Sequence, residues 1–223
     1  MIVEARPATE EERAALGEQY NTFEQQHTTA ELGMWIFLAT ELMLFGGLFT
    51  AYTVYRTVYP AGFAEGSRHL ELIYGAPNTA VLILSSLTMA MAVRCSQLGE
   101  QRKLVWYLIA TALLGTLFMA VKGAEYYKHF VDGMVPGLAW RYVGPYPGPV
   151  QLFFFAYFTM TGLHAVHLIV AIAIVFVTAL LARRGAFPPR RHLPVEMVGL
   201  YWHFVDMVWT FLLPLLYFFG LTE

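Results

Sequence analysis

Long runs of apolar residues, separated by short polar segments, dominate this chain of 223 residues. Five runs are long enough to cross a bilayer, because its hydrocarbon core of about 30 Å needs about 20 helical residues. Their approximate bounds are residues 32–55, 77–97, 103–127, 150–182 and 197–220. None alternates with the period of two that is typical of a strand. The pattern therefore predicts an all-α integral membrane protein, a bundle of five transmembrane helices.

The segments outside these runs predict two regions and several boundaries. Residues 1–30 are polar and rich in glutamate, and they lack the apolar core of a cleaved signal peptide. We expect a mobile polar arm over 1–30 and a membrane domain over 31–223. Thr28 or Thr29 is expected to cap the first membrane helix, and Pro77 to stand at the start of the second.

The composition agrees with a membrane protein. Hydrophobic residues make up 57% of the chain and charged residues 13%, whereas soluble domains average about 25% charged residues. The net charge of -2 gives no sign of nucleic-acid binding. Cys95 is the one cysteine in the sequence, which excludes an intrachain disulfide and a cysteine metal cluster.

The distribution of lysine and arginine predicts the orientation. The arm and the loops after the second and fourth runs carry nine of these residues, and the opposite side carries five, Lys122 among them. Because positive loops remain in the cytoplasm, we expect a cytoplasmic N-terminus and a C-terminus outside.

The last run contains three ionisable residues, Glu196, His203 and Asp206. Their spacing places them near one helical face. Each would cost about 2.5–3.5 kcal/mol on an insertion scale if it faced lipid at the membrane centre. This face must therefore dock against protein, water or lipid headgroups.

Other intramembrane residues allow more than one interpretation. Glu41 is either a proton-sensitive site or a neutral acid bonded to a neighbouring helix, and Gly46-Gly47 suits close helix packing. Lys122 and Glu125 are expected to form a surface ion pair at the membrane boundary. The small polar residues of the second run are expected to be packing positions: Asn78, Thr79, Ser85 and Ser86.

His164 and His167 share a helical face and resemble half of a metal site. No complete ligand motif accompanies them, so a hydrogen-bonded polar patch or a lipid-headgroup contact is the preferred interpretation. Together with Glu41, Glu196, His203 and Asp206, they are candidates for an intramembrane polar network. Residue types alone leave helix packing, a ligand site and a proton relay open.

The sequence Leu200-Tyr-Trp-His-Phe-Val-Asp-Met-Val-Trp209, preceded by Glu196, resembles the signature of subunit III of the haem–copper oxidases. Thr161-Gly-Leu-His-Ala-Val-His167 resembles a second motif of that family, and the earlier runs agree in order over about residues 30–220. The chain departs from the family in having five spans where many members have seven. Lys122 stands where glutamine is common.

The resemblance implies a non-catalytic subunit in the inner membrane of a bacterium. Subunit III of this family binds no haem or copper, which lie in partner subunits I and II, and it holds structural phospholipid beside subunit I. It helps to sustain proton uptake during oxygen reduction and proton pumping. A small subunit IV and a respiratory supercomplex are further candidate partners, and the electron donor is either cytochrome c or quinol. Glu41, His164, His167, Glu196, His203 and Asp206 would then line lipid or packing surfaces, with Glu125 as a structural polar residue.

Three other functions compete with this interpretation. One is an accessory subunit III-like protein of a nitric oxide reductase. Another is a stand-alone proton-coupled transporter, which would need broken helices or inverted repeats that the sequence does not show. The last is a membrane metalloenzyme that uses the intramembrane histidines and acids.

Overall fold

The computed structural model describes residues 20, 22–70, 72–138, 140–187 and 192–218. Within these ranges the chain forms six α-helices and no strand. The helices are α2 (Phe23–Val58), α3 (Pro60–Arg68), α4 (Leu72–Leu98), α5 (Gln101–Val131), α6 (Pro147–Arg183) and α7 (Leu193–Leu213), and α7 continues as the π-helical segment η2 (Pro214–Phe218). All except α3 are long and apolar enough to cross a membrane. The all-α, multi-pass prediction is therefore confirmed.

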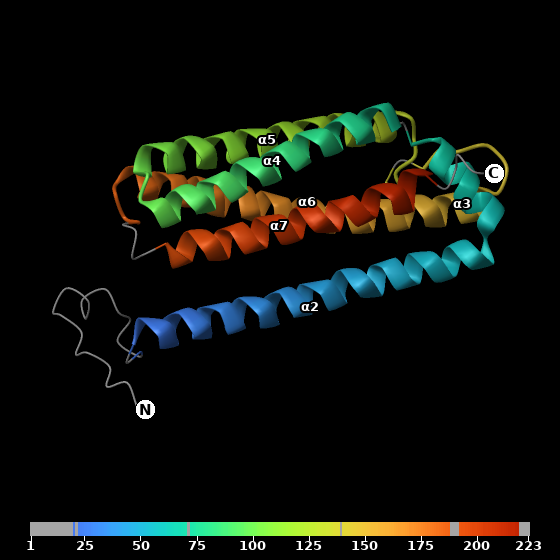
Figure 1. Cartoon of the computed structure of the whole chain (residues 1–223). Helices are drawn as coiled ribbons and strands as arrows, with labels where there is room; N and C mark the ends of the chain where they lie inside the picture. Colours follow the sequence, from blue (N-terminus) through green and yellow to red (C-terminus); the bar gives the residue numbers. More distant parts are fainter. Residues whose placement is uncertain (1–19, 21, 71, 139, 188–191, 219–223) are drawn as a thin grey trace.

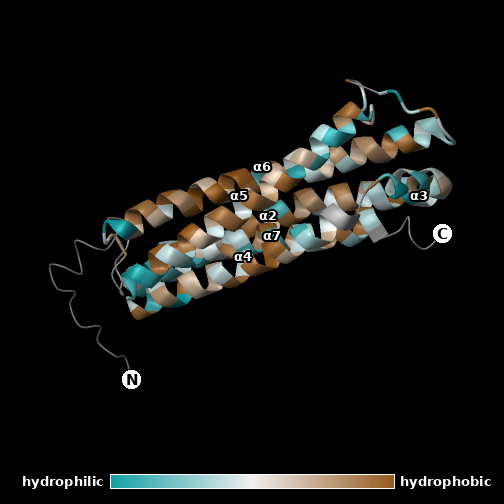
Figure 2. Cartoon of the chain, turned by 90° about the horizontal axis from the view of Figure 1, so that it is seen from above, coloured by the Kyte–Doolittle hydropathy of each residue, from teal (hydrophilic) through white to brown (hydrophobic). Residues whose placement is uncertain are grey.

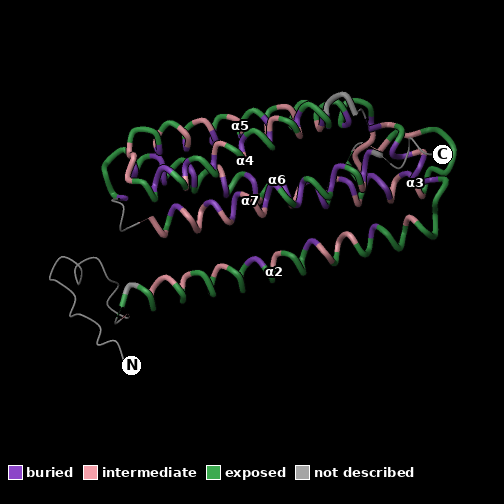
Figure 3. The backbone as a smooth tube through the Cα atoms, viewed as in Figure 1, coloured by how far each residue is buried: buried purple, intermediate pink, exposed green. Residues whose placement is uncertain are grey.

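Helices α4 to α7 pack into a bundle, and α2 lies along one side of it (Figure 1). Helix α2 touches α6 and α7 through a line of aromatic contacts, which includes Phe45 against His167 and Phe37 against Tyr201. In the most apolar segment of α2 only 11% of the residues are buried, compared with 50% in α7. Figure 3 shows this contrast as an α2 that is mostly exposed beside a bundle with a buried interior.

Residues along the middle of the helices are mostly hydrophobic, and hydrophilic residues gather toward both ends of the bundle (Figure 2). Large side chains such as Trp35, Met43, Ile83 and Trp106 are exposed. A contiguous apolar surface of this kind is expected where lipid or a partner helix covers the protein. The inside and the outside are both apolar, so close packing rather than hydrophobicity decides which face turns inward.

The helix boundaries differ from the sequence predictions. Helix α2 begins at Phe23, and the side chain of Thr22 caps it by accepting the backbone N–H of Gln25 at 3.1 Å. The predicted cap at Thr28 or Thr29 is wrong, because both residues lie inside the helix, and residues 23–30 are helical. The rest of the predicted arm, residues 1–19 and 21, lies outside the described residues.

Pro77 is not at the start of its helix, because α4 begins five residues earlier. A proline in this place removes one backbone hydrogen bond, and the apolar residues around it favour a continuous membrane helix.

Small residues allow close packing at specific places. A Cβ atom on Gly62 of α3 would lie 2.2 Å from the Cβ of Pro149, and one on Gly115 would lie 2.7 Å from the Trp202 ring. The expectation for Gly46 and Gly47 is wrong within this chain, since a Cβ on either would meet no atom within 4 Å. The adjacent Phe45 contacts α6 and α7 here, so the close approach is made by an aromatic side chain and not by the two glycines.

Candidate functional site

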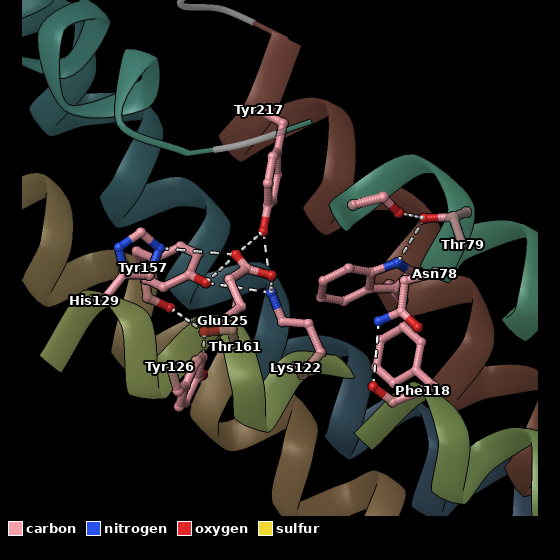
Figure 4. Close-up of polar contacts among 12 residues, drawn as sticks. Asn78, Thr79, Phe118, Lys122, Glu125, Tyr126, His129, Tyr157, Thr161 and Tyr217 are labelled. Atoms are coloured by element: carbon pink, nitrogen blue, oxygen red, sulfur yellow. Dashed lines mark hydrogen bonds and ion pairs between the residues drawn. The ribbon is translucent and has the colours of Figure 1, made fainter. Parts of the chain in front are cut away.

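Among the described residues, a group of buried charges surrounds Lys122 and Glu125 on the inner face of α5 (Figure 4). Lys122 Nζ lies 2.8 Å from Glu125 Oε2, and the side chains are 7% and 2% exposed. Tyr157 of α6 donates to Glu125 Oε1 at 2.7 Å, and Tyr217 of η2 donates to the same oxygen. The ion pair predicted from the sequence is therefore present, but it is buried rather than on the surface.

The ammonium group of Lys122 is enclosed on several sides. It lies 3.0 Å from the hydroxyl oxygen of Tyr217 and 3.2 Å from that of Tyr157. Its nitrogen is also 4.9 Å from the centre of the Trp209 ring, within the range of a cation–π interaction. Besides Glu125 on its own helix, three other segments, α6, α7 and η2, therefore supply partners of this one cation.

The end of α7 explains how Tyr217 reaches this group. Pro214 has no backbone N–H, so it cannot continue the regular hydrogen bonding of the α-helix. The chain continues as the π-helical segment η2, a wider turn that is often associated with functional positions. This segment carries Tyr217 to Lys122 and Glu125.

Glu41 and His167 form a second contact, which joins α2 to α6. The distance from His167 Nε2 to Glu41 Oε2 is 2.9 Å, and His167 Nδ1 lies 2.9 Å from the carbonyl oxygen of Leu163. Nδ1 must donate to that carbonyl, so Nε2 of a neutral ring can only accept. The contact with Glu41 then requires one proton, carried by the carboxylic acid or by the imidazolium. Both sequence interpretations of Glu41 fit this arrangement.

His164 faces another part of the bundle. Its ring lies 5.3 Å from the Trp209 ring and 6.1 Å from the Phe118 ring. It is 1% exposed, and neither of its nitrogens has a hydrogen-bond partner among the described residues. A small pocket of about 70 Å³ lies beside it, with Lys122 and Tyr126 in its wall. The two histidines of α6 therefore have different surroundings and share no ligand position.

The three ionisable residues of α7 are also separated. Glu196 accepts a hydrogen bond from Gln97 at 2.6 Å, and His203 Nδ1 is 2.9 Å from the hydroxyl of Ser86. Both carboxyl oxygens of Asp206 are buried and make no hydrogen bond of normal geometry among the described residues, although Ser86 and Trp202 lie close enough to interact with them. Among those residues no hydrogen bond joins these three side chains to one another, so they belong to separate local contacts.

The small polar residues of α4 bond to neighbouring helices. Thr79 and Ser85 accept the indole N–H groups of Trp209 and Trp202 at 2.9 and 3.3 Å. Asn78 donates to the carbonyl oxygen of Phe118 at 3.3 Å. These bonds fix two large tryptophans of α7 against α4.

Sequence reasoning missed two features. The hydrogen bonds of Tyr157 and Tyr217 to Glu125 could not be predicted, because these residues are far apart in the sequence. A group of His27, His192 and Glu196 was also missed, although their potential ligand atoms lie within 4.8 Å of one another. The spacing of four between His192 and Glu196 was the available signal, whereas nothing in the sequence links His27 to them.

Fold and geometry define the class: a multi-pass helix bundle whose buried polar groups mainly join helices to one another. Residues 145–221 match the family described as "Cytochrome c oxidase subunit III". A cytochrome c oxidase subunit 3 of Synechocystis is 32% identical over 83% of this chain and 73% of its own length. The subunit 3 of Thermostichus vulcanus is 32% identical over 83% of this chain and 85% of its own length. The chain belongs to the cytochrome c oxidase subunit III family, which confirms the resemblance found in the sequence.

Similarity also extends to a quinol oxidase. The cytochrome bo(3) ubiquinol oxidase subunit 3 of Pseudomonas aeruginosa is 27% identical over 84% of this chain and 84% of its own length. Subunits named for cytochrome c oxidases and a subunit named for a quinol oxidase therefore match nearly the same share of the chain.

Proposed function

We propose that this chain is the non-catalytic subunit III of a bacterial aerobic terminal oxidase of the cytochrome c oxidase type. It packs beside subunit I, which reduces oxygen and pumps protons, and it supports that activity through packing, bound lipid and sustained proton uptake. The observation that carries the proposal is the exposed apolar α2, a membrane helix with 11% of its apolar segment buried. A helix with so little cover in its own chain is suited to contact a partner subunit and lipid.

The intramembrane histidines support a role without a redox centre in this chain. His167 contacts Glu41, His203 contacts Ser86, and His164 packs against aromatic rings. They do not converge on a shared point, so haem and copper are assigned to the partner subunits.

A pocket at the far end of α2 supports phospholipid binding. It has a volume of about 310 Å³ and lies between α2 and α3, with Tyr52, Arg56 and Phe63 in its wall. A guanidinium group beside aromatic rings suits a lipid phosphate whose acyl chain lies along an apolar helix. Such a lipid would cover part of the exposed surface of α2.

The orientation belongs to the same proposal, with the N-terminus in the cytoplasm. Lys122 was one of the five positive residues assigned to the opposite side, yet its charge is buried against Glu125. A paired charge inside the bundle adds little to the charge of the loops. The excess of lysine and arginine on the side of the N-terminus therefore becomes larger.

The test is purification of the protein from its native membrane in mild detergent, with the visible spectrum and subunit composition recorded together. Co-purification with a haem–copper subunit I supports the proposal, and a subunit II that carries copper supports the cytochrome c donor. Isolation with a nitric oxide reductase, or as a colourless single chain, would contradict it.

A further inference from the structure

Three side chains from two segments meet where α2 and α7 begin: His27 of α2, and His192 and Glu196 at the start of α7. His27 Nε2 lies 3.5 Å from Glu196 Oε2, and His192 Nε2 lies 3.5 Å from Glu196 Oε1. We propose that these three residues form a binding site for a divalent transition metal of the zinc class, which links α2 to the rest of the bundle.

Each histidine lies at a suitable distance from one oxygen of Glu196, and the three potential ligand atoms lie within 4.8 Å of one another. Zinc binds imidazole nitrogen and carboxylate oxygen at about 2.0–2.2 Å, so two ligands of a tetrahedral site lie about 3.3–3.5 Å apart. Both nitrogen–oxygen distances already have this value. Two imidazoles and one carboxylate are also a ligand set that zinc uses in proteins. The side chains are 40%, 31% and 18% exposed, so water can reach a fourth position.

Neighbouring groups orient the proposed ligands. His27 Nδ1 lies 3.5 Å from Glu31 Oε1, on the side of the ring away from Glu196. Gln97 of α4 donates to Glu196 Oε1 at 2.6 Å. A carboxylate behind a histidine ligand and a hydrogen bond to a carboxylate ligand are typical of the residues that surround metal sites.

The position gives the site a structural consequence. Helix α2 has little buried surface, and its first turns extend beyond the contacts that Glu41 and Phe45 make with α6. One metal ion would add a strong link between α2 and α7 at this end. The competing explanation is a set of ion pairs between protonated imidazoles and Glu196, without a metal.

Zinc binding by the full chain in mild detergent tests the proposal. The protein carries an affinity tag without histidine, is stripped with a chelator, and is dialysed against ZnCl2 with bound metal measured by mass spectrometry. His192→Gln and His27→Gln each remove one ligand. His69→Gln is the matched control, because His69 Nε2 lies 3.8 Å from Glu65, also four residues away, without a second histidine.

We expect one tightly bound Zn²⁺ per wild-type chain and per His69→Gln chain, and at least about tenfold weaker binding in both ligand variants. Cobalt(II) in place of zinc should give the visible absorption of a tetrahedral site in the same two proteins only. The proposal fails if the wild type binds no zinc or if the ligand variants bind as tightly as the wild type. It also fails if His69→Gln weakens binding equally. His27 is the most exposed of the three, so its variant keeps the test valid should His192→Gln fail to fold.

Discussion

The buried ion pair of Lys122 and Glu125 can be tested by removing one charge, the other, and then both. The variants are Lys122→Met, Glu125→Met and the double substitution. At 2.8 Å and an effective dielectric constant of about 20, the attraction between the two charges is about 6 kcal/mol. Most of that attraction offsets the cost of burying them, so the pair's net contribution to stability is small.

Each single variant leaves the other charge buried. We therefore expect Lys122→Met and Glu125→Met to destabilise the chain by about 3–5 kcal/mol each. The double variant leaves no charge. The hydroxyls of Tyr157 and Tyr217 lose the ion pair but can bond to each other, so about one hydroxyl hydrogen is left without a partner, at about 1–3 kcal/mol. The two single costs sum to at least about 6 kcal/mol, so the coupling between the sites should be about 3 kcal/mol or more.

The assay is unfolding of the full chain in mild detergent by titration with a denaturing detergent, followed by helical circular dichroism. Lys103 and Glu100 provide the control, because they have the same spacing and are 2.9 Å apart, yet are 63% and 40% exposed. Lys103→Met should leave the stability almost unchanged, because solvent screens an exposed ion pair. Additive costs for Lys122 and Glu125, or single variants no worse than Lys103→Met, would refute the reasoning.

Four further predictions use the same unfolding assay or co-purification. Glu41→Gln should leave association with the oxidase subunits intact, because its amide N–H can still donate to His167; loss of co-purification would contradict this. His203→Leu should cost about 0.5–1.5 kcal/mol, because it removes the hydrogen-bond partner of the part-buried Ser86 hydroxyl. Asp206→Leu should be neutral or stabilising in the isolated chain, because its oxygens make no hydrogen bond of normal geometry among the described residues, and a clear loss would reveal a missing bond. Gly62→Ala should cost about 1–3 kcal/mol by overpacking, whereas Gly46→Ala, which meets no atom, should change stability by less than about 1 kcal/mol in either direction.

The number and type of helices could be predicted because apolar length is a local property of the sequence. The positions of the helix ends could not be predicted in this way. Helix α2, for example, extends over the mostly polar residues 23–30, before its apolar run, and Thr22 caps its first turn. Helix α3 is too short and too polar to be found as a membrane span. It begins at Pro60 and packs against α6 through small residues. Helix capping and contacts between segments decide such boundaries, and neither is visible in hydropathy.

The candidate site was predictable only in its residue types. Each charge of the Lys122–Glu125 pair looks exposed when it is read from α5 alone, because it stands near the end of an apolar run. Its burial depends on Tyr157 from α6 and Tyr217 from η2, which are far away in the sequence. In the same way, the i and i+3 spacing of His164 and His167 predicts a common face correctly. It cannot predict that one ring turns to α2 and the other to α7.

The hydroxyls around Lys122 and Glu125 give this pair a role that its net stability does not explain. Bonds from two other segments converge on one carboxylate and one ammonium, so a shift of η2 along the bundle would break several at once (Figure 4). A buried polar group of this kind can specify one packing arrangement among several apolar ones. The double methionine variant should then keep its helicity but lose a unique position for η2. Tyrosine ring signals in nuclear magnetic resonance should be single and sharp in the wild type and broadened or multiple in that variant. A single sharp set in both proteins would show that apolar packing alone fixes η2.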